Sequence, residues 1–147
     1  MTIFTDGGCS GNPGPGGWAY VMVNESLESI IQEQWGAEKN TTNNRMELLA
    51  VISALEALQN VEYNGEIKVF TDSQYVQKGI TIWIKDWKIR GWKTASKEPV
   101  KNRDLWQRLD SLASAFPVTW HWVKGHAGNT FNERCDSLTQ KAIASIS

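Results

Sequence analysis

The sequence is poor in cysteine and proline, and neither charge is in strong excess. Cys9 and Cys135 are the only cysteines among 147 residues, and they form neither a metal-ligand spacing nor a disulfide framework. We therefore expect free thiols and a reducing, cytoplasmic location, with a single bridge between the two cysteines as the alternative. No signal peptide, transit peptide or membrane-spanning apolar run is recognisable, so we expect no membrane partner.

The overall charge points to no class of partner, because 15 basic residues oppose 16 acidic ones. The length and the 41% of apolar residues fit one domain, residues 1–147, with a substantial core. The charge is unevenly distributed, however. Between Trp83 and Arg108, eight basic residues oppose three acidic ones, and four of the eight tryptophans lie in the same stretch. Basic side chains interleaved with aromatic ones are typical of a nucleic-acid-binding surface.

Hydrophobic patterning predicts an α/β fold with a five-stranded mixed sheet flanked by helices. Alternating or β-branched runs indicate strands, helical apolar spacing indicates helices, and Gly- and Pro-rich segments such as 11–17 indicate turns. Three strands come first as an antiparallel meander, and two strands then alternate with helices, which favours parallel pairing. The predicted strands are 1–9, 18–23, 29–35, 66–71 and 118–123, and the predicted helices are about 41–59, 73–89, 101–114 and 131–144.

The tripeptide Phe-Thr-Asp occurs twice, each time at the end of a predicted strand. Asp6 and Asp72 close these tripeptides, and turn-forming residues follow both. If the two strands are parallel neighbours, the carboxylates lie side by side at the sheet edge where α/β proteins bind ligands. Two adjacent carboxylates repel, so the pair predicts a bound cation. The alternative is that each Asp only caps a turn.

Glu47 and Asp136 are candidate third and fourth carboxylates, each with a structural alternative. Glu47 lies one turn before Val51, at the edge of the apolar stripe of its helix, but Asn44 and Glu47 also have the spacing of a capping box. Asp136 lies in the first turns of the last helix, where the helix dipole alone favours an anion. His126, in a Gly-flanked loop, has the side chain best suited to moving protons near neutral pH.

Four segments resemble, in order and spacing, the type 1 ribonuclease H family, closely its bacterial stand-alone members. The resemblance runs from about Ile3 to Ile143, and it implies a ribonuclease-H-like fold that hydrolyses the RNA strand of RNA·DNA hybrids, leaving 5′-phosphate and 3′-hydroxyl ends. The matching segments are IFTDGGCSGNPGPGG, TTNNRMELLAVISALE, VFTDSQYV and WVKGHAGNTFNERCD.

The resemblance places the family's catalytic and metal-binding carboxylates on Asp6, Glu47, Asp72 and Asp136, and its loop histidine on His126. It implies two Mg²⁺ ions with substrate bound, with Mn²⁺ as a substitute, where Asp6 contacts both ions. His126 is expected to assist proton movement or product release.

The resemblance also assigns substrate contacts. Residues beside the carboxylates read the minor groove of the hybrid and its 2′-hydroxyls, two residues grip a phosphate of the DNA strand, and the basic stretch handles the duplex electrostatically. The minor-groove set is Cys9, Ser10, Gly11, Asn12, Asn43, Asn44 and Gln74; the phosphate pair is Thr42 and Asn102; Trp83 packs on deoxyribose; and the basic set includes Lys85, Lys88, Arg90 and Lys93.

The sequence departs from the family pattern in two places. Ile89, Asp86 and Glu98 dilute the basic stretch, which implies weaker hybrid binding than in well-known bacterial relatives. Residues 129–131 differ from the common sequence after the loop histidine, which leaves the role of His126 less constrained than that of the carboxylates. We expect a monomer without a separate hybrid-binding domain.

Two other functions remain as alternatives. A non-catalytic module that binds hybrids or double-stranded RNA would retain the basic aromatic stretch but would have no need of four carboxylates. A related metal nuclease acting on DNA, such as a recombinase-type domain, would need the carboxylates but not the TTNNRME and CSGN segments.

Overall fold

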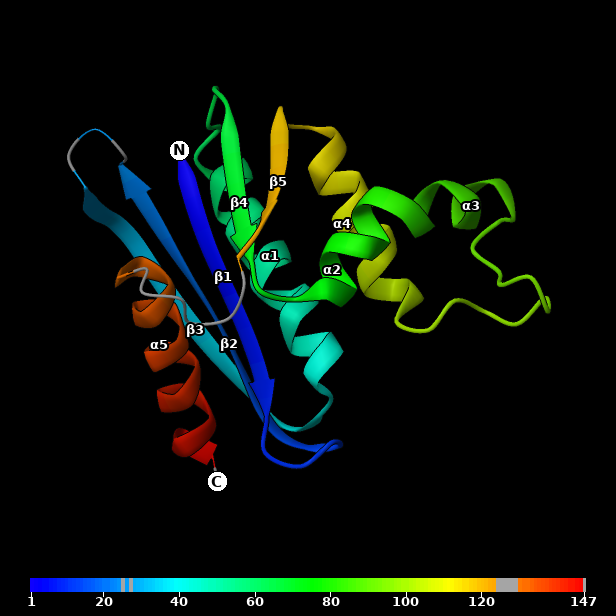
Figure 1. Cartoon of the computed structure of the whole chain (residues 1–147), viewed down its shortest axis with the longest axis horizontal. Coiled ribbons are helices and arrows are strands. Elements are labelled where there is room, and N and C mark those ends of the chain that lie inside the picture. The colour runs from blue at the N-terminus through cyan, green and yellow to red at the C-terminus, as the bar shows by residue number, and fades with distance from the viewer. Residues whose placement is uncertain (25, 27, 124–129, 147) are drawn as a thin grey trace.

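The computed structural model describes residues 1–24, 26, 28–123 and 130–146. A five-stranded sheet lies at its centre, in the order β3-β2-β1-β4-β5 (Figure 1). The first three strands pair antiparallel, and β1–β4 and β4–β5 pair parallel, which confirms the predicted sheet. The strands are β1 (Thr2–Cys9), β2 (Gly14–Asn24), β3 (Ser29–Thr41), β4 (Ile67–Thr71) and β5 (Val118–Trp122).

Helices cover both faces of the sheet. One face packs against α1, which in turn contacts α4, whereas α5 lies across β1, β2 and β3 on the other face (Figure 1). Between β4 and α4, three short helical segments lead outward, and α3 with the loop after it projects from the body. The segments are α1 (Asn43–Asn60), α2 (Gln74–Lys78), the π-helical turn η1 (Gly79–Trp83), α3 (Ile84–Ile89), α4 (Arg103–Ser114) and α5 (Thr130–Ile146).

The alternation of side chains along β1 separates two apolar clusters. Ile3 belongs to the larger cluster, formed with α1 and α4, and Phe4 belongs to the smaller one, under α5. The apolar stripe predicted for α1, from Leu48 to Leu58, is buried in the larger cluster. On the other face, Cys135 of α5 is buried against β1 and β2 and its thiol is free, as the sequence predicted.

The predicted turn over residues 11–17 is wrong in its second half. Strand β2 already begins at Gly14, and β3 continues to Thr41, beyond the predicted end at residue 35. These glycines make room for close neighbours: a Cβ on Gly17 would press on Ala142 of α5. A glycine that admits a neighbouring element cannot be distinguished from a turn glycine by local sequence.

No helix among the described residues combines the length and the apolar character that crossing a bilayer requires.

Adjacent glycines in β1 give a matched test of the close packing between β1 and α1. A Cβ on Gly7 would collide with the backbone of Met46 and Glu47, whereas on Gly8 it would reach only ordinary contact, 3.6 Å from Ile143. We expect Gly7→Ala to lower the free energy of unfolding by about 1–3 kcal/mol, because a helix backbone cannot move aside cheaply. Gly8→Ala should change it by less than about 0.5 kcal/mol. Urea titration followed by circular dichroism measures both, and equal effects would contradict this packing.

Candidate active site

The parallel pairing of β1 with β4 brings the two Phe-Thr-Asp sequences together. Phe4 pairs with Phe70 and Thr5 with Thr71, so Asp6 and Asp72 follow in step at the carboxyl ends of neighbouring strands. Each Asp also follows its Phe by two residues and so faces the same side of the sheet. The structure thus brings the repeated carboxylates together, as the sequence predicted.

Glu47 reaches the same point from the second turn of α1. One carboxylate oxygen from each of Asp6, Glu47 and Asp72 lies within 4.8 Å of the other two. The side chain of Glu47 is turned toward β1, where Oε1 accepts a hydrogen bond from the Gly7 backbone N–H at 2.9 Å. The close approach that a side-chain-free Gly7 permits therefore fixes the position of Glu47.

The capping-box explanation for Glu47 is wrong. Thr42 is the N-cap of α1, and its side chain accepts a hydrogen bond from the backbone N–H of Arg45. Asn44 lies inside the helix, so Glu47 lies two residues beyond the position from which a side chain reaches back to the cap. The burial of its carboxylate therefore has another reason, which is its place in the cluster with Asp6 and Asp72.

Asp136, from α5, lines the same open cavity of about 720 Å³ as the other three carboxylates. It is close enough to raise the pKa of Asp6 by charge repulsion, although burial and Asp72 act more strongly. Four carboxylates from two strands and two helices therefore share one cavity. Its lining includes five of the predicted substrate contacts: Cys9, Ser10, Asn43, Asn44 and Gln74.

The electrostatics of the cluster indicate a cation site. Burial, followed by the charge of Asp72, raises the pKa of Asp6 to about 8. Burial and the charge of Asp6 raise the pKa of Glu47 well above its usual value. In addition, Glu47 Oε2 is buried and has no hydrogen-bond partner among the described residues. Clustered carboxylate oxygens with an unsatisfied buried acceptor suit a hard divalent cation such as Mg²⁺.

The remaining predicted residues within the described ranges are not among those that line this cavity. Gly11 and Asn12 form the turn before β2, where Asn12 Oδ1 accepts from the Asn43 N–H at 3.2 Å. Thr42 and Asn102 are both hydrogen-bonded to Arg45. His126 falls among the residues that the structure does not describe. Trp83, Lys85, Lys88, Arg90 and Lys93 all belong to η1, α3 and the loop that follows them.

Sequence reasoning missed three residues that shape the site. Gly7 contacts α1 and donates to Glu47, Tyr75 lines the cavity, and Trp122 donates its indole N–H to the backbone oxygen of Asp72 at 3.2 Å. Gly7 directly follows the first tripeptide and Tyr75 lies three residues after the second, which is a usable signal. Trp122 could be assigned only once β5 was placed beside β4.

An α/β fold that gathers carboxylates in an open polar cavity is typical of metal-dependent phosphoryl-transfer enzymes, a class that includes nucleases. The sequence model of the RNase H family matches residues 1–144, and this chain belongs to that family. It is 55% identical to a protein named Ribonuclease H from Treponema denticola, over 97% of this chain and 96% of that one. It is also 55% identical to Ribonuclease H from Cupriavidus necator, over 99% and 97%.

Solved structures agree with this assignment. The fold is similar to LC9-RNase H1, described as a type 1 RNase H with the type 2 active-site motif, with a TM-score of 0.86 and 34% identity over 99% of this chain and 72% of that one. It is also similar to LC11-RNase H1, solved in complex with an RNA/DNA hybrid, with a TM-score of 0.75 and 26% identity over 98% and 96%. The chain is therefore a nuclease of the ribonuclease H family.

The repulsion within the cluster predicts an unusual pH dependence of stability without metal. The pKa of Asp6 lies near its ordinary value of 3.8 in the unfolded chain but at about 8 in the fold. Its contribution to stability is therefore complete below pH 4 and is lost as the pH rises toward 8. We expect Tm in EDTA to fall over this range and Mg²⁺ to restore it at pH 8 more than at pH 5, because protonated carboxyls bind cations poorly.

Asp6→Asn removes the titrating group, so at pH 8 in EDTA it should melt higher than the unsubstituted protein, by about 2–4 °C for each 1 kcal/mol of repulsion removed. Asp110→Asn is the control, because Asp110 pairs with Lys88 at the surface and its removal relieves no repulsion in the cluster. Differential scanning calorimetry measures both variants. A Tm in EDTA that rises between pH 5 and pH 8 would show that the carboxylates do not repel as described.

Proposed function

We propose that this chain hydrolyses the RNA strand of RNA·DNA hybrids, using Mg²⁺ held by Asp6, Glu47, Asp72 and Asp136. One observation carries the proposal: three of these carboxylates converge within 4.8 Å in a cavity that the fourth also lines. The family supports the reaction, and the hybrid bound to LC11-RNase H1 supports the substrate.

The carboxylates have one task in this reaction, which is to hold cations against the scissile phosphate. When bound, a pair of Mg²⁺ ions activates a water and stabilises the leaving 3′-oxygen, which leaves a 5′-phosphate on the other product, and Mn²⁺ can supply the same chemistry. Asp6, which has an oxygen within 4.8 Å of both Glu47 and Asp72, would be the carboxylate shared by both ions. The Gly7 N–H fixes Oε1 of Glu47, so Oε2 is the oxygen left for a cation.

The polar rim of the cavity is suited to the minor groove of the hybrid. Asn43, Asn44 and Gln74 offer amide groups that can both donate to and accept from a ribose 2′-hydroxyl. The Cys9 thiol is directed into its own turn, where Gly14 O and Thr41 O accept from it at 3.3 Å. Cys9 therefore contributes through its backbone, as do Ser10 and Gly11 in the same turn.

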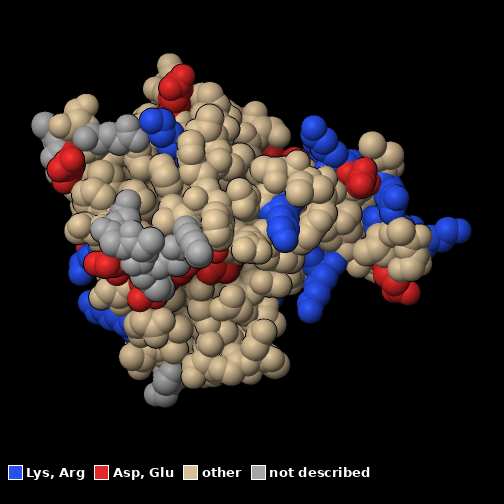
Figure 2. Space-filling model, in the orientation of Figure 1, with Lys and Arg blue, Asp and Glu red and all other residues tan. Residues whose placement is uncertain are grey.

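The basic segment from η1 to the loop after α3, called the protrusion here, would hold the duplex beside the cavity. Figure 2 shows its Lys and Arg side chains gathered on the projecting part of the molecule. Arg90, Lys93 and Lys97 surround a hollow of about 350 Å³. Lys88 instead pairs with Asp110, at 3.3 Å, so its charge is less available to a phosphate.

The tryptophans of the protrusion mainly form its internal support. Trp87 contacts Trp83, Trp92 and Trp106, with ring centroids 5.9, 6.5 and 5.3 Å apart. Trp83 also packs edge-on against Tyr75, at 5.9 Å. It is only half-buried, so its remaining surface can pack on a deoxyribose.

His126 keeps its proposed role in proton movement or product release on the resemblance alone. A non-catalytic hybrid-binding module is disfavoured, because such a module would gain nothing from burying Asp6 and Glu47 at 7% and 5% exposure. Buried repelling carboxylates cost stability and are retained where they bind a cation.

Cleavage of labelled duplexes tests the proposed function directly. With Mg²⁺ we expect cleavage of RNA·DNA but not of RNA·RNA or DNA·DNA, and none in EDTA, because the carboxylates act through bound cations. Asp6→Asn should lower kcat by about a thousandfold or more while hybrid binding, measured by fluorescence anisotropy, persists. Hybrid cleavage in EDTA, equal cleavage of all duplexes, or an active Asp6→Asn variant would each refute the proposal.

The protrusion should act on binding more than on chemistry. We expect the double substitution Lys93→Ala/Lys97→Ala to raise KM for the hybrid about tenfold at low salt, with kcat nearly unchanged and the difference shrinking as salt increases. The control pair is Lys141→Ala, which removes a charge stacked on Trp35 of β3, and Lys88→Ala, whose charge Asp110 already neutralises. A loss confined to kcat would contradict the binding role.

A further inference from the structure

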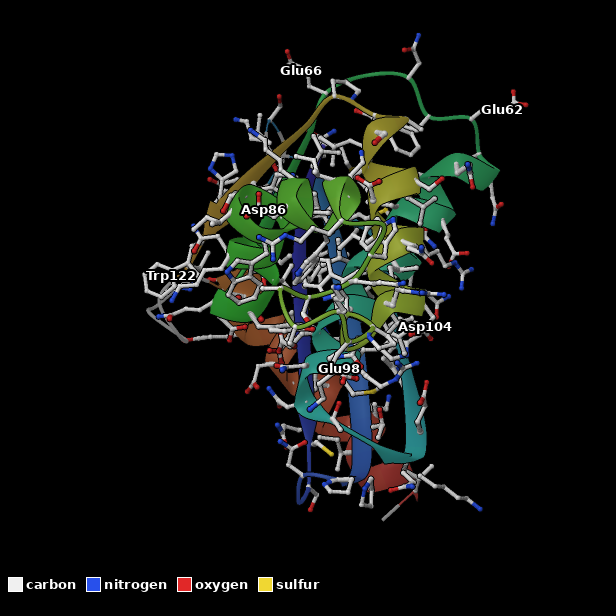
Figure 3. The ribbon with its side chains drawn as sticks, turned by 90° about the vertical axis from the view of Figure 1, so that its right-hand side faces the viewer. Glu62, Glu66, Asp86, Glu98, Asp104 and Trp122 are labelled. Atoms are coloured by element: carbon white, nitrogen blue, oxygen red, sulfur yellow. The ribbon has the colours of Figure 1, made fainter. Side chains whose placement is uncertain are left out.

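Arg45 connects two parts of the chain that lie far apart in sequence. Its backbone N–H donates to Thr42 Oγ1 at 3.3 Å, and its Nη1 donates to Asn102 Oδ1 at 3.3 Å. The guanidinium also makes a bidentate pair with Asp104, at 3.1 and 3.0 Å (Asp104 is labelled in Figure 3). One side chain in the first turn of α1 thus holds the residues that begin α4.

These bonds determine which way the carboxamide of Asn102 faces. An arginine only donates, so the oxygen of Asn102 must be the atom directed at Arg45. Its nitrogen then donates to the Tyr75 hydroxyl at 3.2 Å, and that hydroxyl also accepts from Trp106 Nε1 at 2.8 Å. The backbone of Asn102 is held as well, in the left-handed region at φ 61°. The side chain is therefore fixed at both ends.

Both Thr42 and Asn102 keep a donor in this arrangement. A carboxamide nitrogen carries two hydrogens, of which Tyr75 takes one, and a threonine hydroxyl that accepts from a backbone N–H can still donate its own proton. Thr42 is bonded to the backbone of Arg45 and Asn102 to its guanidinium, so a single residue connects the two groups. Two neutral donors connected in this way suit an anionic phosphate group.

We propose that Arg45 is the positioning residue of the DNA-phosphate subsite that the family resemblance assigns to Thr42 and Asn102. The inference rests on the proposed function, which supplies the hybrid and its DNA strand. Arg45 itself does not bind the phosphate, since Asp104 and Asn102 occupy its guanidinium. Tyr75 lines the carboxylate cavity as well as holding Asn102, so the subsite adjoins the reaction centre.

The ion pair between Arg45 and Asp104 contributes little to the stability of the fold. A substitution of Arg45 can therefore show a positioning role without unfolding the protein. Asp104 is 66% exposed and Arg45 32%, and pairs at such exposure are weak. Arg45→Gln should therefore melt close to the unsubstituted protein while binding hybrid poorly. Arg134→Gln is the matched control: Arg134 makes the same kind of bidentate pair with Glu33, at 2.9 and 2.7 Å, and its loss removes the same charge.

The experiment uses hybrids whose DNA strand carries one uncharged methylphosphonate, moved along the strand position by position. At one position the unsubstituted protein should lose affinity, seen as a rise in KM of about tenfold with kcat preserved. Arg45→Gln and Arg45→Lys should both raise KM for the unmodified hybrid about tenfold and reduce the methylphosphonate penalty to about twofold or less. Arg134→Gln should keep the full penalty.

Each failure has a distinct meaning. If Arg45→Gln keeps the full methylphosphonate penalty in KM, positioning by Arg45 is refuted. It is also refuted if Arg45→Lys binds hybrid like the unsubstituted protein, because that result would indicate a direct contact between the charge and the phosphate. If hybrid is cleaved but no position is sensitive, the subsite is refuted while the proposed function stands. If hybrid is not cleaved at all, the proposed function fails. Should Arg45→Gln not fold, Tyr75→Phe, which releases the nitrogen of Asn102, must show the same loss of the penalty.

Discussion

The parallel pairing of β1 with β4 is the constraint on which the rest of the site depends. It places Asp6 beside Asp72 at the edge of the sheet, because Phe4 and Phe70 are paired partners in register. A shift of one residue would send one of the two carboxylates to the opposite face. The carboxyl ends of parallel strands form the natural ligand-binding edge of an α/β sheet. Here α1 and α5, on opposite faces of the sheet, bring Glu47 and Asp136 to the cavity at that edge.

The carboxylates so assembled destabilise the fold that holds them. Their burial and mutual repulsion raise the pKa values of Asp6 and Glu47, and within the described part of the chain Glu47 has a buried oxygen without a hydrogen-bond partner. The burial of the larger apolar cluster, which includes Ile3 of the sheet, the apolar stripe of α1 and Trp106 of α4, offsets this loss of stability. Strain of this kind persists where it serves a ligand, and the ligand that relieves it is a divalent cation.

Recognition of the nucleic acid relies on a second set of connections, which lead from the cavity to the protrusion. Tyr75 connects the cavity with the protrusion. It lines the cavity, and its hydroxyl accepts hydrogen bonds from Asn102 and Trp106. Its ring packs on Trp83. The aromatic cluster around Trp87 then extends this support into the protrusion. The carboxylates, the proposed phosphate subsite and the basic surface are thus held in fixed positions relative to one another by packed rings and hydrogen bonds.

The sequence by itself determined the order of strands and helices and the buried stripe of α1, because periodicity is a local property. Its resemblance to the family selected the four carboxylates that line one cavity. The sequence misjudged Gly14–Gly17 as a turn and left the cap of α1 open, because close packing and side-chain direction depend on neighbours distant in the chain. Only the tertiary structure decided that Gly7 admits α1 and that Arg45 meets Asn102. Such contacts join residues about 40 to 60 positions apart, and their geometry exists only once the sheet has set which elements are adjacent.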